Sequence, residues 1–452
     1  MNVKSVLSKL LICLLIVLSF VLGVNYKNKT NEPVENKNIE ITNVFHDEKN
    51  SIEQHEGYQL EKAVILSRHN IRSPLTDKDS MLKKVTNNEW FNWSSKSSEL
   101  SIRGGNLETE MGQYFRRYFA LEGLFEENII PNDEEVRFYA NSLQRTISTA
   151  NFFKSGMFPL GNLEVEYHEE VGTMDPVFNP QLTYVSDKFI KEAIKEIGEM
   201  GGEDGINGIE EKLTENFAIL EEVLDYKETE EYIKTNTNLL KTNDLEIVLE
   251  VNKEPAMKGS LKTANSIADA FTLQLYEERD LNKASFNHDL GESDWEKIGE
   301  IVDTYSDVLF TTKAISTNVA HPLLKEIKNE LDNDDRKFSF LCGHDSNIAS
   351  VTAALGVNDY KLDNAITKKA PIGSKLVFEI WHNELNEKYI TISMVYQSVN
   401  QLRNLSPLDI DNPPCKYRLE LEGLTSYGNN YYKYEDVINR FKDSIDAYEI
   451  LK

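Results

Sequence analysis

The chain of 452 residues is strongly acidic, with a formal net charge of −26 from 49 Lys and Arg and 75 Asp and Glu residues. This excess argues against a surface built for nucleic acid or anionic lipid, because both ligands would be repelled. Hydrophobic residues make up 40% of the chain, which is enough for a large core, and the length allows two or three domains. A site for a small anion would need positive charge concentrated in one place.

The N-terminal region is typical of an export signal followed by a linker. Two lysines precede the apolar run Leu10–Leu22, which is short for a membrane span but suits the core of a signal peptide. We expect residues 1–24 to be a signal peptide that directs the protein to the periplasm or another extracytoplasmic compartment. If uncleaved, residues 10–23 would anchor it to the membrane. The polar residues 25–56 lack periodicity and are predicted to form a disordered spacer.

The first chemically informative motif is Arg68–Pro74 (RHNIRSP), which follows a predicted strand at Ala63–Leu66. It places His69 between Arg68 and Arg72. An imidazole flanked by guanidiniums is suited to attack a phosphorus atom while the arginines hold the phosphoryl oxygens. An ordinary polar loop after a strand has a similar composition, so this motif alone leaves both interpretations open.

A second motif, Ala140–Thr146 (ANSLQRT), follows a predicted strand at Val136–Tyr139 and begins a predicted helix. Arg145 then falls in the first turn of this helix, where free backbone N–H groups and the helix dipole attract an anion. Met174–Pro180 (MDPVFNP) comes next and is rich in turn residues. Asp175 either shapes a pocket entrance or is a simple turn residue before the following proline.

The segment 186–304 is predicted to be a helical insertion. Its apolar residues recur at spacings of three and four, both between Phe189 and Ile197 and over Leu261–Tyr276, as in amphipathic helices. The insertion divides an α/β domain into residues 57–185 and 305–452. The site is then expected in a cleft beside the strand ends, where open α/β sheets usually bind ligands.

The third motif is Gly343–Ile348 (GHDSNI), directly after a strand-like run at Phe338–Cys342. His344 beside Asp345 at the carboxyl end of a strand supplies one more anion donor and one candidate proton donor. Further strands are predicted on β-branched and aromatic content at Lys375–Ile380, Tyr389–Val395 and Lys416–Leu421.

Together the Arg-His loop, the Gln-Arg-Thr segment and the His-Asp pair resemble the signature of the histidine acid phosphatase family. The stretches RHNIRSPL, YANSLQRT, GTMDPVFNP, GHDSNIAS and VYQSVNQLRN are most similar to its bacterial glucose-1-phosphatase branch, and the resemblance extends from about Glu56 to about Phe441. It implies a histidine-phosphatase-type α/β domain with an inserted, mainly helical domain and an active site in the cleft between them. The implied reaction is hydrolysis of sugar phosphomonoesters such as glucose 1-phosphate through a covalent phosphohistidine.

The resemblance also assigns a role to each matching residue. His69 is the expected nucleophile, and Asp345 is expected to protonate the leaving oxygen, which favours an acidic pH optimum. The phosphoryl oxygens would be held by Arg68, Arg72, Arg145 and His344. No cofactor is expected, because the arginines do what magnesium does in other phosphoryl-transfer enzymes. The other histidines lack ligand spacing, so no metal site is expected either.

Glu254, in the context Glu-Pro, is the candidate for substrate selectivity. In the glucose-1-phosphatase branch, a glutamate in a similar context projects from the helical insertion toward the substrate. A carboxylate there would accept hydrogen bonds from sugar hydroxyls and repel polyphosphorylated ligands such as phytate. The alternative is an ordinary solvated glutamate before a proline.

Several alternatives stay open at this point. A phytase or broad-specificity acid phosphatase of the same superfamily would differ only in its pocket walls. The intact His69, Asp345 and three arginines argue against a non-catalytic surface binding protein. The export leader and the His-Asp pair argue against a phosphoglycerate-mutase-like enzyme. The expected partner is a small phosphorylated substrate, and the protein would associate with a membrane only if residues 10–23 stay attached. Cys342 lies in an apolar run, so a disulfide with Cys415 is not favoured.

Overall fold

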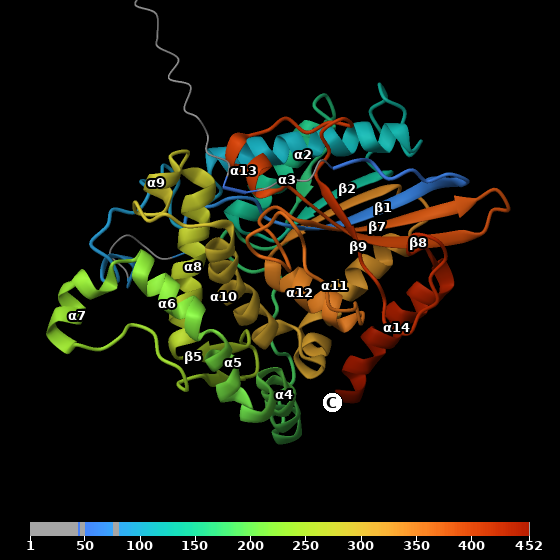
Figure 1. Ribbon diagram of the computed structural model, residues 1–452. Helices are drawn as coiled ribbons and strands as arrows, with labels where there is room; N and C mark the ends of the chain where they lie inside the picture. The colour runs from blue at the N-terminus through green and yellow to red at the C-terminus, as the bar shows by residue number, and fades with distance from the viewer. Residues whose placement is uncertain (1–43, 46–49, 76–80, 452) are drawn as a thin grey trace, which may run out of the picture. The chain divides into compact units, whose positions relative to one another are not determined.

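A mixed eight-stranded sheet organises the part of the chain that the computed structural model describes, which comprises residues 44–45, 50–75 and 81–451 (Figure 1). The strands are β1 (Tyr58–Arg68), β2 (Val136–Ala140), β3 (Val165–Glu166), β6 (Phe338–Gly343), β7 (Lys375–Asn383), β8 (Lys388–Tyr396), β9 (Cys415–Arg418) and β10 (Tyr432–Lys433). Their order is β10-β8-β7-β1-β6-β2-β3, with β9 paired to β8. Strands β1, β6, β2 and β3 are mutually parallel, and β7 to β10 add antiparallel pairs. Each predicted strand is present, although β9 ends at Arg418, three residues before the predicted end.

Helices cover both faces of this sheet, which explains the unbroken apolar run in β1. Ala63 and Ile65 pack in one core cluster with α2 (Ile102–Leu121) and α3 (Gln144–Met157). Val64 and Leu66 point the other way, into a cluster formed with α11 (Lys313–Asp332), α12 (Asp345–Ala354) and α14 (Tyr434–Leu451). Figure 1 shows these two helical layers on opposite sides of the strands. Successive side chains of a strand alternate between faces, so a doubly covered strand needs apolar residues at every position.

Residues from 187 to 310 are mainly helical, as predicted. The helices are α4 (Asp187–Gly201), α5 (Ile206–Lys212), α6 (Thr214–Val223), α7 (Glu230–Thr235), α8 (Ser260–Glu277), α9 (Leu281–Ala284) and α10 (Glu292–Phe310), with a short hairpin of β4 (Glu246–Val248) and β5 (Ala256–Lys258). The remaining short elements are α13 (Val399–Asn404) and the 3-10 turns η1 (Met81–Lys83), η2 (Gly202–Asp204) and η3 (Tyr226–Glu228). Helix α10 runs across the predicted boundary at residue 304. Residues from Val44 onward form one compact unit, so the division into a domain and an insertion stays a prediction.

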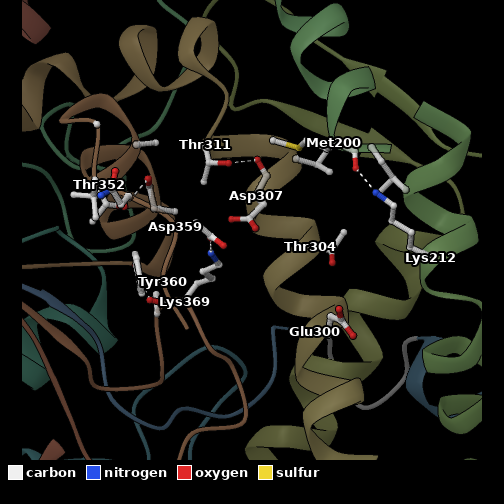
Figure 2. A pocket seen from close by; sticks show the side chains of 18 of the residues that line it. Met200, Lys212, Glu300, Thr304, Asp307, Thr311, Thr352, Asp359, Tyr360 and Lys369 are labelled. Carbon is white, nitrogen blue, oxygen red and sulfur yellow. Dashed lines mark hydrogen bonds and ion pairs between the residues drawn. The ribbon is translucent and has the colours of Figure 1, made fainter. Parts of the chain in front are cut away.

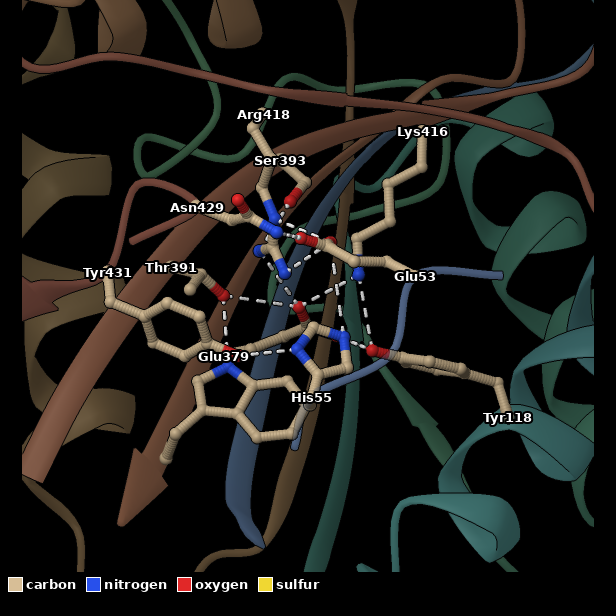
Figure 3. Close-up of polar contacts among 11 residues, drawn as sticks. Glu53, His55, Tyr118, Glu379, Thr391, Ser393, Lys416, Arg418, Asn429 and Tyr431 are labelled. Atoms are coloured by element: carbon tan, nitrogen blue, oxygen red, sulfur yellow. Dashed lines mark hydrogen bonds and ion pairs between the residues drawn. The ribbon is translucent and has the colours of Figure 1, made fainter. Parts of the chain in front are cut away.

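The end of the predicted spacer is packed rather than disordered. His55 is buried, stacks on Trp381 with ring centroids 4.1 Å apart, and its Nδ1 lies 2.5 Å from the hydroxyl of Tyr431 (Figure 3). Two residues earlier, Glu53 pairs with Arg418 at 2.7 Å. These contacts hold residues 50–56 against strands β7 and β9. The predicted leader and residues 25–43 and 46–49 of the spacer lie outside the described residues.

A cavity of about 490 Å³ lies where α5, α10 and α12 meet (Figure 2). Asp307, Asp359 and Lys369 are among its lining residues, and Lys369 forms an ion pair with Asp359. None of the residues predicted for the site lines this cavity. The three sequence motifs lie elsewhere, at the ends of β1, β2 and β6.

Among the described helices, none is long and apolar enough to cross a membrane.

Candidate active site

The three motifs meet at the carboxyl ends of three adjacent parallel strands. Arg68 ends β1 and lies in register with Gly343, which ends β6. On the other side of β6, Ala140 at the end of β2 lies in register with Cys342. Because parallel strands end at the same edge of a sheet, segments far apart in the sequence come together there. The sheet thus brings His69, Arg145 and His344 close together.

His69 is buried and holds its imidazole in one defined tautomer. Its Nδ1 lies 2.9 Å from the backbone carbonyl oxygen of Asn70. A carbonyl only accepts hydrogen bonds, so Nδ1 carries the proton and Nε2 keeps its lone pair. Burial, together with the positive charges of Arg145 and Arg72, holds the pKa of His69 well below its usual value. Both effects favour the neutral imidazole, in which Nε2 is available as a nucleophile.

His344 is oriented by Asn141, a residue that the sequence analysis did not single out. The side-chain oxygen of Asn141 accepts a hydrogen bond from the backbone N–H of Asp175 at 2.9 Å, which turns its amide nitrogen toward His344 Nε2 at 2.6 Å. A neutral His344 then carries its proton on Nδ1. Burial and the charge of Arg145 lower the pKa of His344, in keeping with a neutral ring. His344 and His69 lie edge to face, with ring centroids 5.5 Å apart.

The three arginines are only partly matched by protein carboxylates. Arg68 Nη2 lies 3.0 Å from Asp345 Oδ2, and Arg72 Nη2 lies 3.1 Å from Asp269 Oδ2. Within the described part of the chain, the buried Nε atoms of Arg68, Arg72 and Arg145 have no hydrogen-bond partner. Burial and the nearby charge of Arg72 lower the pKa of Arg145 to about 10. Buried, unmatched guanidinium donors favour an anionic ligand, because an anion relieves both the repulsion and the unsatisfied N–H groups.

Asp345, the predicted proton donor, is the first residue of α12. Burial acts to raise its pKa, but the positive charge of Arg68, together with a further contribution from the neighbouring His344, outweighs burial, so the pKa of Asp345 is lowered. Its Oδ1 also accepts a hydrogen bond from the backbone N–H of Ser346 at 2.9 Å. In this form of the protein, Asp345 is therefore an ionised carboxylate paired with Arg68.

Glu254 lies just before β5 with its side chain accessible to solvent. Its pKa is raised, first by partial desolvation and then by the negative charge of Asp345, while Arg145 acts in the opposite direction. These electrostatic interactions place the carboxylate within range of Asp345 and Arg145. An ordinary glutamate on a distant surface would not sense those two groups.

Two more acidic residues, Asp175 and Asp269, support the site. The sequence left the role of Asp175 open and did not point to Asp269. Asp175 is buried, accepts a hydrogen bond from the Tyr139 hydroxyl at 2.8 Å, and also closes the turn at Val177. It is thus both a turn residue and the anchor that orients Asn141. Asp269 lies on α8, and its only sequence signal is a carboxylate among the apolar residues that α8 buries. No group of three or more described His, Cys, Asp or Glu side chains is placed to hold a metal ion.

Residues 59–397 match the histidine phosphatase superfamily (branch 2). This segment contains all three motifs, from the Arg-His loop to the His-Asp pair, together with Glu254. The chain therefore belongs to the histidine phosphatase superfamily, branch 2, and is a phosphatase. The family and the class of enzyme expected from the sequence are confirmed.

Known relatives cover most of the chain. It is 36% identical over 392 residues to a glucose-1-phosphatase of Salmonella typhimurium, covering 85% of this chain and 93% of that protein. It is 27% identical over 384 residues to a phytase of Escherichia coli, covering 81% of this chain and 87% of that protein. The apo structure of Hafnia alvei phytase superposes with a TM-score of 0.79 at 24% identity and covers 88% of this chain and 99% of that one. That likeness concerns the fold alone, and it confirms the predicted α/β class.

Proposed function

We propose that this phosphatase hydrolyses sugar phosphomonoesters such as glucose 1-phosphate through a covalent phosphohistidine. The observation that carries the proposal is a buried, neutral His69 with a free Nε2 beside three arginines whose Nε donors are unmatched. The choice of a sugar phosphate rests on the relatives, since the chain is 36% identical to a glucose-1-phosphatase and 27% identical to a phytase.

In the first step, His69 Nε2 attacks the phosphorus atom in line with the ester oxygen. A P–N bond forms while the P–O bond to the sugar breaks, and the bonding electron pair leaves with the sugar oxygen, which takes a proton from Asp345. The guanidiniums and the Nδ1–H of His344 bind the equatorial oxygens and stabilise the charge in the transition state. In the second step, a water oxygen attacks the phosphorus atom, and the P–N bond breaks as the new P–O bond forms. Its electron pair returns to His69 Nε2, Asp345 recovers its proton from the water, and inorganic phosphate is released.

Substrate binding itself can supply the protonated form of Asp345. In the free protein, the positive charge of Arg68 keeps the pKa of this carboxyl low. A bound phosphoryl group takes over the Arg68 charge and adds negative charge beside Asp345, and both effects raise its pKa. Turnover should therefore fall as the pH rises and bound Asp345 loses its proton. An acidic pH optimum is the expected outcome.

Glu254 would select the leaving group. Its carboxylate, which senses the charges of Asp345 and Arg145, is suited to accept hydrogen bonds from sugar hydroxyls and to repel further phosphates. This feature favours a monophosphorylated sugar over phytate. The second candidate function, phytate hydrolysis, is supported by the phytase relatives and would require that Glu254 not exclude the extra phosphates.

The test is a substrate panel at acidic and neutral pH, combined with trapping of the phosphoenzyme. Glucose 1-phosphate should be hydrolysed faster than phytate, and His69→Ala should abolish turnover and labelling of an acid-labile, base-stable phosphoenzyme. The matched control is His382→Ala, because His382 lies at the end of β7 opposite to the strand ends that form the site. Near wild-type activity of His69→Ala would rule out the mechanism, and faster hydrolysis of phytate would favour the second function.

We also propose that the protein is exported, which rests on the apolar run Leu10–Leu22 after two lysines. Fractionation of cells that express the full chain should recover activity outside the cytoplasm. A variant without residues 1–24 should stay in the cytoplasm. Equal distribution of the two proteins would contradict export through this segment.

A further inference from the structure

A fully buried ion pair lies beneath the loop that carries His69. Lys375 Nζ, from the first residue of β7, lies 2.8 Å from Glu108 Oε1 on α2, and both side chains are 0% exposed. Removing two charges from water costs several kcal/mol, and their mutual attraction restores this only when the geometry is good and the remaining polar atoms are bonded. Such a pair is weak evidence of a stabilising role, so its other contacts decide what it does.

The other carboxylate oxygen of Glu108 is hydrogen-bonded to Asn70, the residue that follows His69. Glu108 Oε2 accepts a hydrogen bond from Asn70 Nδ2 at 2.8 Å, and Asn70 Oδ1 accepts one from the N–H of Ile71 at 2.8 Å. The backbone N–H of Asn70 donates to Thr149 Oγ1 at 3.2 Å, and its carbonyl accepts from His69 Nδ1. Both the side chain and the backbone of Asn70 are thus fixed by hydrogen bonds, and its carbonyl determines the tautomer of His69.

The lysine end of the pair holds the opposite flank of the same loop. Lys375 Nζ donates to the carbonyl of Gly373 at 2.7 Å, and the N–H of Gly373 donates to the carbonyl of His69 at 3.1 Å. Gly373 has φ +69°, and a Cβ there would lie 2.6 Å from Asn70 Nδ2, so only glycine allows this close approach. The ion pair is therefore connected to the backbone carbonyl of His69 through Gly373 and to its imidazole through Asn70.

We propose that Glu108 and Lys375 are positioning residues for the reaction, acting through Asn70 to fix the ring and the tautomer of His69. The inference rests on the proposed role of His69 as nucleophile. When the P–N bond forms, the imidazole becomes cationic and its Nδ1–H binds the Asn70 carbonyl more strongly. A carbonyl that is already aligned stabilises this transition state, whereas a loosened one must first be reoriented. The expected effect is therefore on kcat rather than on KM, because the arginines are untouched.

Two substitutions break this connection at different points. Glu108→Gln removes the charge that binds Lys375, and Asn70→Ala removes the link while leaving the ion pair in place. Each should lower kcat and the rate of phosphoenzyme formation about 10- to 100-fold, the effect of a small misplacement of a reacting group, with KM and the affinity for inorganic phosphate nearly unchanged. The double variant should be no slower than the slower single variant, because both changes break one chain of contacts.

The matched control is Glu379→Gln, which alters another buried ion pair on β7. Glu379 lies 3.2 Å from Lys416 and takes no part in the His69 loop (Figure 3). It should lower stability without lowering kcat of the folded protein. A readout independent of activity is the long-range ¹H–¹⁵N NMR pattern of His69, which should show the Nδ1–H tautomer in the parent protein and a mixture of tautomers in Asn70→Ala.

The outcomes separate the two proposals. If His69→Ala is inactive but folded Asn70→Ala keeps its kcat and its tautomer, the positioning role is overturned while the mechanism stands. If His69→Ala is active, the mechanism itself fails. If Glu108→Gln does not fold, Asn70→Ala still decides, since it keeps the buried charges paired. A fall in kcat of similar size in Glu379→Gln would also overturn the inference, because the effect would then be general destabilisation.

Discussion

Two groups of buried and half-buried cations in this protein differ in how completely carboxylates neutralise their charge. In the network on β7 and β9, Arg418 contacts both Glu53 and Glu379, and Lys416 shares Glu379 (Figure 3). Burial acts against the charged form, but these carboxylates outweigh it and raise the pKa of Arg418. Lys416 and Arg418 in turn outweigh the burial of Glu379 and lower its pKa to about 2. This network is closed, because its charges are neutralised within the protein.

The candidate active site shows the opposite balance. Arg145 has its pKa lowered to about 10 by burial and by Arg72, and the Nε donors of all three arginines are unmatched within the described residues. Side chains of the same kind thus serve different purposes. A closed network holds a chain segment in place, whereas an open set of donors keeps its electrostatic attraction for a ligand. In a chain of net charge −26, the open set concentrates the positive charge that a phosphate group would require.

The largest expected effect comes from removing one arginine from each group. Arg145→Met should lower kcat/KM at least about 100-fold, the usual result of losing one transition-state donor, and should leave the free energy of unfolding unchanged or higher because like charges no longer repel. Arg418→Met should do the reverse and lower the free energy of unfolding by about 3 kcal/mol, because it removes the cation paired with Glu53 and one of the two cations that neutralise the buried Glu379. Steady-state kinetics and urea unfolding measure both. Similar losses of activity in the two variants would refute the distinction.

The second prediction tests the carboxylate that pairs with Arg68 in the site. Asp345→Asn should slow hydrolysis of glucose 1-phosphate about 100-fold or more, because a sugar alkoxide leaves poorly without a proton. An aryl phosphate, whose leaving group needs little protonation, should slow far less. The ratio of kcat values for the two substrates is the measurement. Equal losses on both would show that Asp345 only holds Arg68.

The third prediction concerns the rim of the open site. Glu254→Ala should raise the ratio of phytate to glucose 1-phosphate hydrolysis roughly five- to a hundredfold, the effect of one lost hydrogen bond or charge contact of about 1 to 3 kcal/mol. Hydrolysis of an aryl phosphate should change much less. Glu250→Ala is the matched control, since Glu250 pairs with Lys253 in the same segment. If both variants keep the parent ratio, Glu254 takes no part in selectivity.

The sequence predicted those site residues that stand in a motif directly after a strand. Arg68, Arg145 and His344 could be placed together because parallel strands end at one edge of a sheet. Asp269 could not, since it lies 197 positions after the Arg72 that it contacts, and a carboxylate among the apolar residues of a helix does not reveal its partner. Lys375 was predicted only as the start of a strand, although its buried contact with Glu108 supports the His69 loop.

The same limit explains the errors in the fold. Residues 50–56 have the polar composition of a spacer, yet His55 is buried, because its partners come from β7 and from the loop before β10. Long-range partners of this kind leave no trace in local composition. The strands and amphipathic helices were predictable because their periodicity reflects burial on one or both faces, which is a local property of the sequence.

The smallest expected effect belongs to the closed network and concerns its pH dependence. Burial lowers the pKa of His55 to about 4 from its usual 6.5, despite the nearby Glu379. The imidazole of His55 is therefore protonated below about pH 6.5 in the unfolded chain but only below about pH 4 in the folded protein. The free energy of unfolding consequently decreases as the pH falls from 6.5 to 4. This histidine should account for about 2 to 3 kcal/mol of unfolding free energy between pH 7 and pH 4.

His55→Phe keeps an aromatic ring against Trp381. In urea unfolding it should lose less stability than the parent protein over that pH range, with unchanged kcat. His382→Phe, which removes the histidine next to Trp381 in the chain, is the matched control and should behave as the parent protein. If His55→Phe shows the parent pH dependence, His55 does not titrate in the network, and carboxylates account for the acid sensitivity.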